Sequence, residues 1–527
     1  MQLIVKNRDT TRTIEAFEGK TLSESLNAAG IRLCMACGGN NRCGRCQVKL
    51  LAGKFRIGKE DYDATVKGER TVNSCATIPA EDFGRIAIPA SSLLPDNEII
   101  ESGIGVELDL SDALPGIGVA FDIGTTTIAG ALVANGRIRA VGGLPNPQSR
   151  FGDNVIDRIV YAGRSPMALE EMRRTLIDEA LDLLLLKLTD SPESIDRIAI
   201  AANTVMSHIF YGVSPESIGV APFCPRLLNF PVKQAKEYGL AVNPEASVAI
   251  LPALSGNVGG DVTGGIAATH FGRNSEKNEL LLDIGTNCEI VLSIRGKRFA
   301  ASAAAGPAFE GSSATVGSRA GRGAIDHMNI TESGVFNFHV IGGDLRRING
   351  ICGSGLVDFL ASARVAGLLD TNGRFDWLRL ENLGRLLPGT PQSGCGCLLA
   401  ENLSIYESDV ESLLKAKAAI AGGVAALLNY AGIRPEELDM LYLCGAFAAK
   451  LNLDSARRIG LIPPLSDERI KVCGNTSLAG AILAVAKPEV LELLESERQL
   501  YTNVNLNELE CFQSYFTEAL TLNAEVE

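Results

Sequence analysis

Alternating and periodic positions of apolar residues predict a small mixed domain at the start of the chain. Residues 2–6 and 12–17 alternate apolar and polar side chains, which is typical of two strands of a hairpin. The sequence Thr-Leu-Ser-Glu at 21–24 is a capping box and predicts a short helix that stops at Gly30. A further apolar pattern at 85–88 predicts another strand.

A strand–turn–strand pattern then occurs twice. Residues 118–133 contain Asp-Ile-Gly-Thr between two apolar runs, and residues 279–292 repeat the same four residues in the same context. Each copy is followed by a long helical pattern and by a strand that ends in a polar turn. This self-similarity predicts an internal duplication and therefore two related α/β lobes. The helical patterns are at 167–189 and 407–432, and the later strands with their turns are at 197–204 and 440–446.

These patterns divide the chain into five segments. The stretch before residue 116 contains Pro95 and Pro115 and has no periodicity, so we expect a linker there. The last segment is expected to dock on the second lobe. The segments are a first domain at 1–90, a linker at 91–115, lobe 1 at 116–270, lobe 2 at 271–489 and a C-terminal tail at 490–527.

Composition narrows the classes of function. Of 527 residues, 46% are hydrophobic and 21% charged, and the net charge is −13, which argues against a basic surface for nucleic acid. No apolar run reaches the roughly 18 to 20 residues of a membrane span. The N-terminal sequence lacks the features of a signal peptide, so we expect a cytoplasmic protein. Thirteen cysteines fit a reducing, anaerobic cell.

Cysteines form the most specific motif of the first domain. Cys37, Cys43 and Cys46 have the spacing C-x5-C-x2-C, and Cys75 follows 29 residues later. This is close to the spacing of a [2Fe–2S] ferredoxin loop, and hairpin, helix, cysteine loop and further strands are the order of a β-grasp ferredoxin. Two knuckles that pair Cys34 with Cys37 and Cys43 with Cys46 would instead suit structural zinc, although they leave Cys75 without a role. Disulfides are disfavoured because five cysteines are an odd number.

The two repeated turns have the chemistry of a phosphate site. A Gly-Thr turn presents backbone N–H groups and hydroxyls to phosphate oxygens. The preceding acids, Asp122 and Asp283, are suited to hold Mg²⁺, which prefers oxygen ligands. Neither a P-loop nor a G-x-G-x-x-G motif after a strand is present.

The motifs of the two lobes and of the first domain resemble those of a known group of proteins. The repeated Asp-Ile-Gly-Thr and the Leu-Cys-Gly-Ala-Phe at 443–447 resemble the phosphate and adenosine motifs of the acetate/sugar kinase, Hsp70 and actin superfamily. Together with the cysteine motif, nearly the whole chain resembles the reductive activators of corrinoid proteins. Some members of that family carry a middle domain between linker and ATPase, for which the linker at 91–115 leaves no room. Further matching motifs are at 203–208, 259–261, 306–311 and 350–355.

The resemblance implies an ATP-dependent reaction. One electron passes from the cluster to an inactive Co(II) corrinoid held by another protein and regenerates Co(I), with a cellular low-potential donor supplying the electron. A homodimer is suggested by the family alone. The alternatives are an ATP-binding iron–sulfur sensor or electron carrier, a small-molecule kinase with an accessory cluster, and a dehydratase activator.

The resemblance also implies roles for individual residues. The expected cluster ligands are Cys37, Cys43, Cys46 and Cys75. The residues expected at the phosphates are Gly124, Thr125, Thr126, Thr127, Gly285, Thr286 and Asn287, with Gly306 near them. Asp122 and Asp283 are expected to serve Mg²⁺ and the attacking water, Asp261 and Glu310 are weaker candidates for positioning that water, and Gly445 and Ala446 border the adenosine.

The remaining cysteines and the histidines carry no motif. Cys352, Cys395 and Cys397 could form a second metal site, but ordinary buried or surface thiols are favoured because no further ligand lies nearby in the sequence. None of the four histidines lies in an Asp-x-His-x-x-Gly corrinoid motif. We therefore expect the corrinoid to belong to the partner protein.

Overall fold

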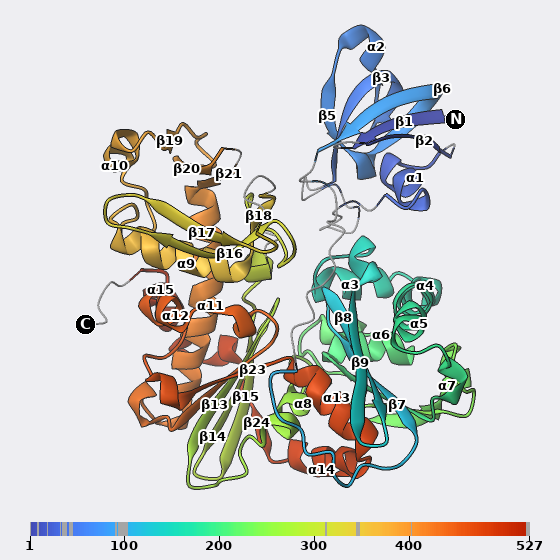
Figure 1. The fold of residues 1–527 in the computed structure, drawn as a ribbon, viewed down its shortest axis with the longest axis vertical. Coiled ribbons are helices and arrows are strands. Elements are labelled where there is room, and N and C mark those ends of the chain that lie inside the picture. Colours follow the sequence, from blue (N-terminus) through green and yellow to red (C-terminus); the bar gives the residue numbers. More distant parts are fainter. Residues whose placement is uncertain are drawn as a thin grey trace. The chain divides into compact units, whose positions relative to one another are not determined.

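A computed structural model gives the fold (Figure 1). Contacts divide the chain into two compact units, which are described separately. The first contains Met1–Asp96 and Asn146–Glu179, and the second contains Asn97–Pro145 and Ala180–Glu527. The structure describes residues 2–7, 10–17, 19–31, 33, 39, 41, 46–89, 92, 104–310, 314–343, 348–401 and 403–522.

The N-terminal part of the first unit is the predicted β-grasp domain. Its sheet has the order β2-β1-β6-β3-β4, with β5 paired to β3, and β1 is antiparallel to β2 but parallel to β6. Helix α1 (Leu22–Ala28) begins with the predicted capping box, in which Thr21 and Glu24 exchange side-chain and backbone hydrogen bonds. Leu22 and Leu26 are buried in the core of the domain. The strands are β1 (Gln2–Asn7), β2 (Thr10–Glu15), β3 (Gln47–Ile57), β4 (Glu60–Asp63), β5 (Arg70–Asn73) and β6 (Thr77–Ile88), and α2 spans Ala64–Lys67.

The rest of the first unit begins with a 3-10 helix at Pro147–Arg150 and contains two capped α-helices. Asn154 caps α3 (Val155–Ala162), and Ser165 caps α4 (Pro166–Leu176). A π-helical turn at Ile177–Leu181 follows, and the chain then continues into α5 (Asp182–Leu188) of the second unit. The helical pattern predicted at 167–189 is thus confirmed, with one π-helical turn inside it.

The second unit contains two sheets that share a core of five strands in the same order, which confirms the duplication; the sixth strand, β11 or β24, lies on opposite edges of the two sheets. Their orders are β11-β12-β10-β7-β8-β9 and β23-β22-β13-β14-β15-β24. In the first sheet, β7 is antiparallel to β8 and parallel to β10. In the second sheet, β13 is likewise antiparallel to β14 and parallel to β22. The first sheet contains β7 (Ile117–Ile123), β8 (Thr127–Ala134), β9 (Arg137–Pro145), β10 (Arg197–Ala202), β11 (Phe230–Gln234) and β12 (Ser247–Ile250). The second contains β13 (Asn278–Ile284), β14 (Cys288–Ile294), β15 (Lys297–Ala303), β22 (Met440–Cys444), β23 (Ile470–Gly474) and β24 (Tyr501–Asn503).

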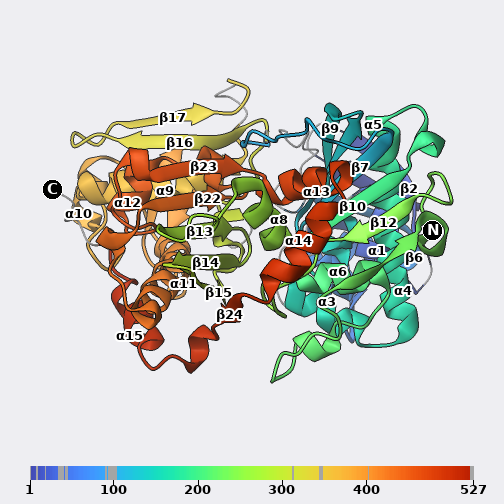
Figure 2. The ribbon, with the colours of Figure 1, turned by 90° about the horizontal axis from the view of Figure 1, so that it is seen from below.

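Two small-residue helices lie between these sheets (Figure 2). Helix α8 (Gly260–Thr269) comes from the first half, and α13 (Thr476–Ala486) comes from the second. They approach so closely that a Cβ atom on Gly480 would lie 2.1 Å from the Cα of Gly264. Helix α13 also packs on the sheet of the first half, because a Cβ on Gly118 would lie 2.6 Å from Val485. The two halves are therefore joined by a glycine contact.

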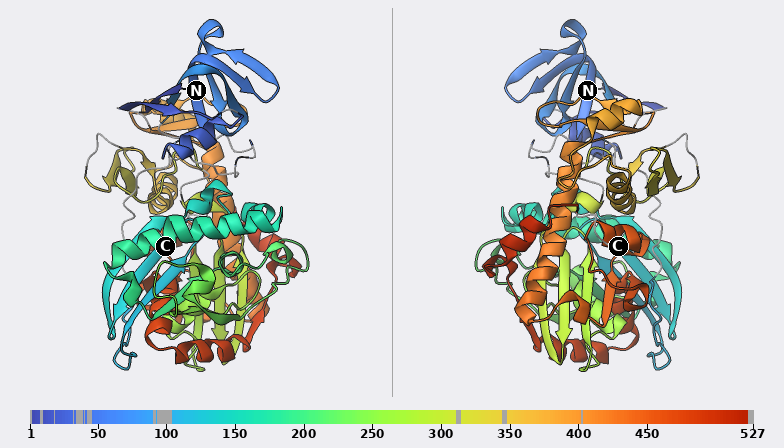
Figure 3. Two further views of the ribbon diagram at one scale, coloured as in Figure 1. Left: turned by 90° about the vertical axis from the view of Figure 1, so that its right-hand side faces the viewer. Right: turned by 90° about the vertical axis from the view of Figure 1, so that its left-hand side faces the viewer.

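The second half carries additional elements on its sheet. Helix α11 (Glu407–Ala431), which confirms the pattern predicted at 407–432, contacts β14 and β15 (Figure 3). The tail contacts it too, since Lys417 Nζ donates to the carbonyl of Thr521 at 2.7 Å. The other elements of the unit are α6 (Thr204–Tyr211), α7 (Ala235–Tyr238), β16 (Ala324–Ile330), β17 (Phe336–Val340), β18 (Gly350–Ile351), α9 (Gly353–Val365), α10 (Trp377–Asn382), β19 (Leu386–Leu387), β20 (Gly396–Ala400), β21 (Leu403–Tyr406), α12 (Leu453–Arg458), α14 (Glu489–Arg498) and α15 (Phe512–Glu518).

Candidate nucleotide and cluster sites

The first Gly-Thr turn joins β7 to β8. Asp122 is the next-to-last residue of β7, and the turn of Gly124, Thr125 and Thr126 leads into β8 at Thr127. A Cβ on Gly124 would lie 2.7 Å from the carbonyl oxygen of Thr127, so the turn requires glycine. The amide of Asn203, at the end of β10, contacts the Thr125 hydroxyl at 3.1 Å. This turn is thus fixed by the neighbouring parallel strand.

The second turn has the same form. Asp283 is the next-to-last residue of β13, and the Gly285 N–H donates to the Asn287 carbonyl at 2.8 Å across the turn that contains Thr286. Gly445 follows the neighbouring strand β22 with φ +94°. A Cβ at that position would lie 2.9 Å from both Asp283 Oδ1 and the Ile284 carbonyl oxygen, so only glycine lets the chain pass so close.

Each strand-end acid faces a helix from the other half. The Ser477 hydroxyl donates to Asp122 Oδ1 at 2.8 Å, and the Asn475 amide donates to Oδ2 at 2.9 Å. Both residues are at the N-terminal end of α13. At the matching end of α8 lies Asp261, which interacts electrostatically with Asp283. The duplication therefore brings the predicted acids of both halves into one site.

Burial sets the charge state of these acids. Burial raises the pKa of Asp122, although the hydrogen bonds from Ser477 and Asn475 partly oppose the shift. Burial, reinforced by neighbouring carboxylates, raises the pKa of Asp261 and that of Asp283 to about 7 each. None of the ion pairs within the described residues includes these three acids.

This donor set fits a hard cation. The three acids offer oxygen ligands, which suits Mg²⁺, and a bound cation would offset the repulsion between them. Over the described part of the chain, no group of three or more His, Cys, Asp or Glu side chains is arranged to hold a metal ion. The site therefore fits a cation that has few protein ligands and takes the others from phosphate and water, as Mg²⁺ usually does.

Contacts with this region are not established for the three other predicted residues. Gly306 has φ +73° and open space around it, and Ala446 is exposed next to Gly445. Glu310 ends a short 3-10 helix, Pro307–Glu310, but its side chain lies outside the described residues.

Two of the four predicted cluster ligands lie within the described residues, and the fold brings them together. The Cys46 and Cys75 side chains contact each other, and this contact lowers the pKa of Cys46 to about 5. The backbone holds the pair, because the Ser74 N–H donates to the Cys46 carbonyl at 3.0 Å. Adjacent thiols at these positions fit two ligands of an iron–sulfur cluster. Cys37 and Cys43, like Cys34, lie outside the described residues.

Sequence reasoning missed several polar residues of the nucleotide site. Asn475 and Ser477 lie more than 350 residues from Asp122 and matched no motif of the repeated turns. Glu289 is six residues after Asp283 but lies on the next strand, so its position opposite Asp283 follows from the register of the hairpin.

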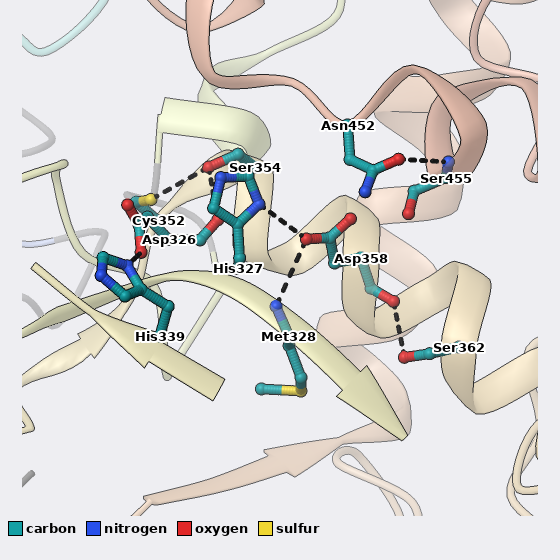
Figure 4. A network of polar contacts seen from close by, with 10 residues as sticks. All are labelled: Asp326, His327, Met328, His339, Cys352, Ser354, Asp358, Ser362, Asn452 and Ser455. Carbon is teal, nitrogen blue, oxygen red and sulfur yellow. Dashed lines mark hydrogen bonds and ion pairs between the residues drawn. The ribbon is translucent and has the colours of Figure 1, made fainter. Parts of the chain in front are cut away.

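A separate polar network lies in the second half, around β16, β17 and α9 (Figure 4). His327 Nδ1 lies 3.0 Å from Asp358 Oδ2, and His339 Nδ1 lies 2.5 Å from Asp326 Oδ1. The Cys352 thiol lies 3.4 Å from the Ser354 hydroxyl. Asp358 Oδ2 also accepts from the Met328 N–H at 3.3 Å, and the Ser354 hydroxyl donates to the Asp326 carbonyl at 2.8 Å. Neither this network nor Cys395 and Cys397 belongs to a metal-ligating group in the ranges that the structure describes.

Family models match the chain in three consecutive parts. Residues 5–80 match the 2Fe-2S iron-sulfur cluster binding domain, 117–274 the RACo middle region and 277–527 the C-terminal ASKHA domain of RACo. The model of the RACo middle region covers the segment expected to be lobe 1, whose sheet begins with β7 directly after the expected linker. The described helices include none that is long and apolar enough to cross a membrane.

Individual proteins agree with these models. The chain is 30% identical over 408 residues to the corrinoid activation enzyme RamQ of Eubacterium limosum, covering 74% of this chain and 68% of that one. It is 25% identical over 451 residues to a Co(II) methylated amine-specific corrinoid protein reductase of Methanosarcina barkeri, covering 77% and 78%. A solved structure of a reductive activator for corrinoid, iron-sulfur protein matches 99% of this chain and 98% of its own with 29% identity and TM-score 0.71.

Fold and site thus define an iron–sulfur protein with a duplicated nucleotide-binding fold of the sugar kinase, Hsp70 and actin type. Within that class, the chain belongs to the family of reductive activators of corrinoid proteins.

Proposed function

We propose that this protein uses ATP to reduce the inactive Co(II) form of a corrinoid protein to Co(I), one electron at a time. One observation carries the proposal: the same chain contains both an adjacent pair of thiols, Cys46 and Cys75, and a duplicated nucleotide-binding fold. The acids of the two halves of that fold lie close enough to interact. The family to which the chain belongs supports it. We further propose a cellular low-potential electron donor, a cytoplasmic reaction and a homodimeric protein.

The first domain, at 1–90, would hold the electron carrier. Cys37, Cys43, Cys46 and Cys75 are the proposed ligands of a [2Fe–2S] cluster. When bound, this cluster supplies one electron at a potential of about −400 mV. Transfer against 100 mV costs about 2.3 kcal/mol, so an energy source is needed for a lower-potential acceptor.

Lobe 1, at 116–270, and lobe 2, at 271–489, would bind and hydrolyse ATP. The turns Gly124–Thr127 and Gly285–Asn287 would hold the phosphates from opposite sides, with Gly306 nearby, while Gly445 and Ala446 border the adenosine. Asp122 and Asp283 would hold Mg²⁺ and orient the attacking water, with Asp261 and Glu310 assisting. ATP can drive the reduction only if nucleotide binding changes the affinity of this protein for the different states of its partner.

An anaerobic assay tests this proposal. Cluster-loaded protein is mixed with a chemical reductant and a Co(II) corrinoid protein, and the absorbance of Co(I) is followed with ATP and with a non-hydrolysable analogue. We expect Co(I) to accumulate with ATP only. Absence of Co(I) with every corrinoid partner tried, despite a reduced cluster and ATP turnover, would refute the proposal in favour of a sensor or of a carrier for another acceptor.

A further inference from the structure

Glu289 lies beside the proposed water-activating acid, in a position that none of the roles above uses. In the ladder between β13 and β14 it is directly opposite Asp283. Directly opposed residues of an antiparallel pair project on the same face of the sheet, with Cβ atoms about 4.5 to 5.5 Å apart. On the next strand Ser302 is opposite Glu289, and its hydroxyl contacts Glu289 Oε1 at 3.4 Å.

The first half lacks this acid. There Asp122 is opposite Ala129, and Ala129 is opposite Gly143. The row across the second sheet thus carries a second carboxylate and a hydroxyl where the matching row of the first sheet carries only small apolar residues. The two halves therefore differ at this row, because the additional oxygen groups are on the sheet that carries Asp283.

Glu289 has little compensation from the protein. The residue is 9% exposed, and the ion pairs of the described ranges do not include it. Its acidic neighbours are Asp261 and Asp283. Burial of a carboxylate without strong partners is unfavourable. Such a carboxylate is retained most readily where a polar ligand completes its hydrogen bonds.

Glu279 gives the contrast on the neighbouring strand. It is also buried, at 4% exposure, and lies four residues before Asp283 on the same face of β13. Its carboxylate accepts hydrogen bonds from the Gly272 N–H at 2.8 Å and from the Tyr442 hydroxyl at 3.2 Å. Two groups from other residues thus satisfy Glu279, whereas the contacts described for Glu289 are the Ser302 hydroxyl at 3.4 Å and its own backbone N–H.

We propose that Glu289 is a further catalytic residue, which accepts a hydrogen bond from the attacking water and orients it toward the γ-phosphorus. The inference rests on the proposed ATP hydrolysis. In that step the water oxygen bonds to the γ-phosphorus and the bond from that phosphorus to the bridging oxygen of ADP breaks. One water proton stays on the released phosphate, and the other leaves to solvent. Ser302 acts as a positioning residue through its contact with Glu289.

The test compares Glu289→Gln with the matched variant Glu279→Gln in the full-length, cluster-loaded protein. Each change removes one buried carboxylate from the same pair of strands and keeps the side-chain size. For Glu289→Gln we expect kcat for ATP hydrolysis to fall by about 100-fold, with the KM for ATP unchanged, since misplacing a reacting group by about 1 Å costs a factor of this order. Glu279→Gln should keep kcat. Calorimetric binding of Mg-ADP and the visible spectrum of the cluster should be unchanged in Glu289→Gln.

If Glu289→Gln does not fold, Ser302→Ala provides a second test of the assignment. This variant should lower kcat by a smaller factor than Glu289→Gln, without changing the KM for ATP. An unchanged kcat in Glu289→Gln overturns the inference, and so does an equal loss of kcat in Glu279→Gln. Loss of Mg-ADP binding together with kcat overturns it as well, because the residue would then be a ligand or a structural support. If the wild-type protein hydrolyses no ATP, the proposed function itself fails.

Discussion

The glycine contact between α8 and α13 gives the sharpest prediction about how the two halves are joined. In Gly480→Ala, the new methyl group would lie 2.1 Å from the Gly264 Cα and 2.4 Å from its carbonyl oxygen. Both atoms belong to the backbone, so no side-chain rotation can relieve the clash. Ordinary contact begins at 3.4 Å, and the helices would have to separate by about 1.3 Å.

Two terms set the expected magnitude. Overpacking of a well-packed core costs about 1 to 3 kcal/mol, and a clash with backbone belongs at the upper end of that range. Alanine in place of a mid-helix glycine stabilises the helix by about 1 kcal/mol, because alanine has the higher helix propensity. We therefore expect Gly480→Ala to lower the free energy of unfolding by about 2 kcal/mol. Gly480→Val should lower it further, because it adds volume and loses the propensity gain.

Gly265→Ala is the matched control, one residue along α8 from Gly264. There the new Cβ would lie 3.1 Å from the hydroxyl of the Thr476 side chain, so a shift of a few tenths of an ångström suffices. Urea denaturation of the anaerobic protein, followed by circular dichroism, measures both variants. The control should be neutral or slightly stabilised. A Gly480→Ala protein as stable as wild type would refute the close contact of the two helices.

Three further predictions concern single side chains. Cys46→Ser should abolish the visible cluster spectrum while sparing ATP binding in calorimetry, and an intact spectrum would contradict its role as a ligand. Asp283→Ala should keep that spectrum but slow ATP-dependent Co(I) formation at least about 100-fold, so unchanged transfer would exclude it from the active site. His208 is buried, with Nδ1 2.7 Å from the Thr204 carbonyl and Nε2 accepting from the Leu227 N–H, and burial lowers its pKa. The unfolded state therefore binds the proton more readily, and the stability that neutral His208 provides is lost as pH falls below about 6.5. In urea titrations His208→Gln should flatten this dependence, and an identical pH profile would refute the assignment.

The sequence predicted those elements whose signals are local. The capping box of Thr21 and Glu24 appears as predicted, because its two partners are three residues apart. The helical pattern at 407–432 and the repeated Asp-Ile-Gly-Thr turns likewise depend on near neighbours. The duplication followed from comparing the chain with itself, and the matching strand orders of the two sheets confirm it.

Site residues that depend on distant contacts were not predicted. Asp122 could be singled out from its own turn, but its partners Asn475 and Ser477 come from the end of the opposite half. The opposition of Glu289 and Asp283 required the register of a specific ladder. No local pattern encodes such pairs, since they arise only when the sheets have formed.

The amino-acid sequence by itself determined the cysteine spacing, the two Gly-Thr turns and the strand–helix order, because each depends on residues close together in the chain. Only the tertiary structure decided that α8 and α13 cross between the halves and bring Asp261 and Ser477 to the strand-end acids. It also decided that Cys46 meets Cys75, and that Glu289 stands buried beside Asp283. The physical reason is that burial and electrostatic interaction depend on distance in space, and folding sets that distance independently of separation along the chain.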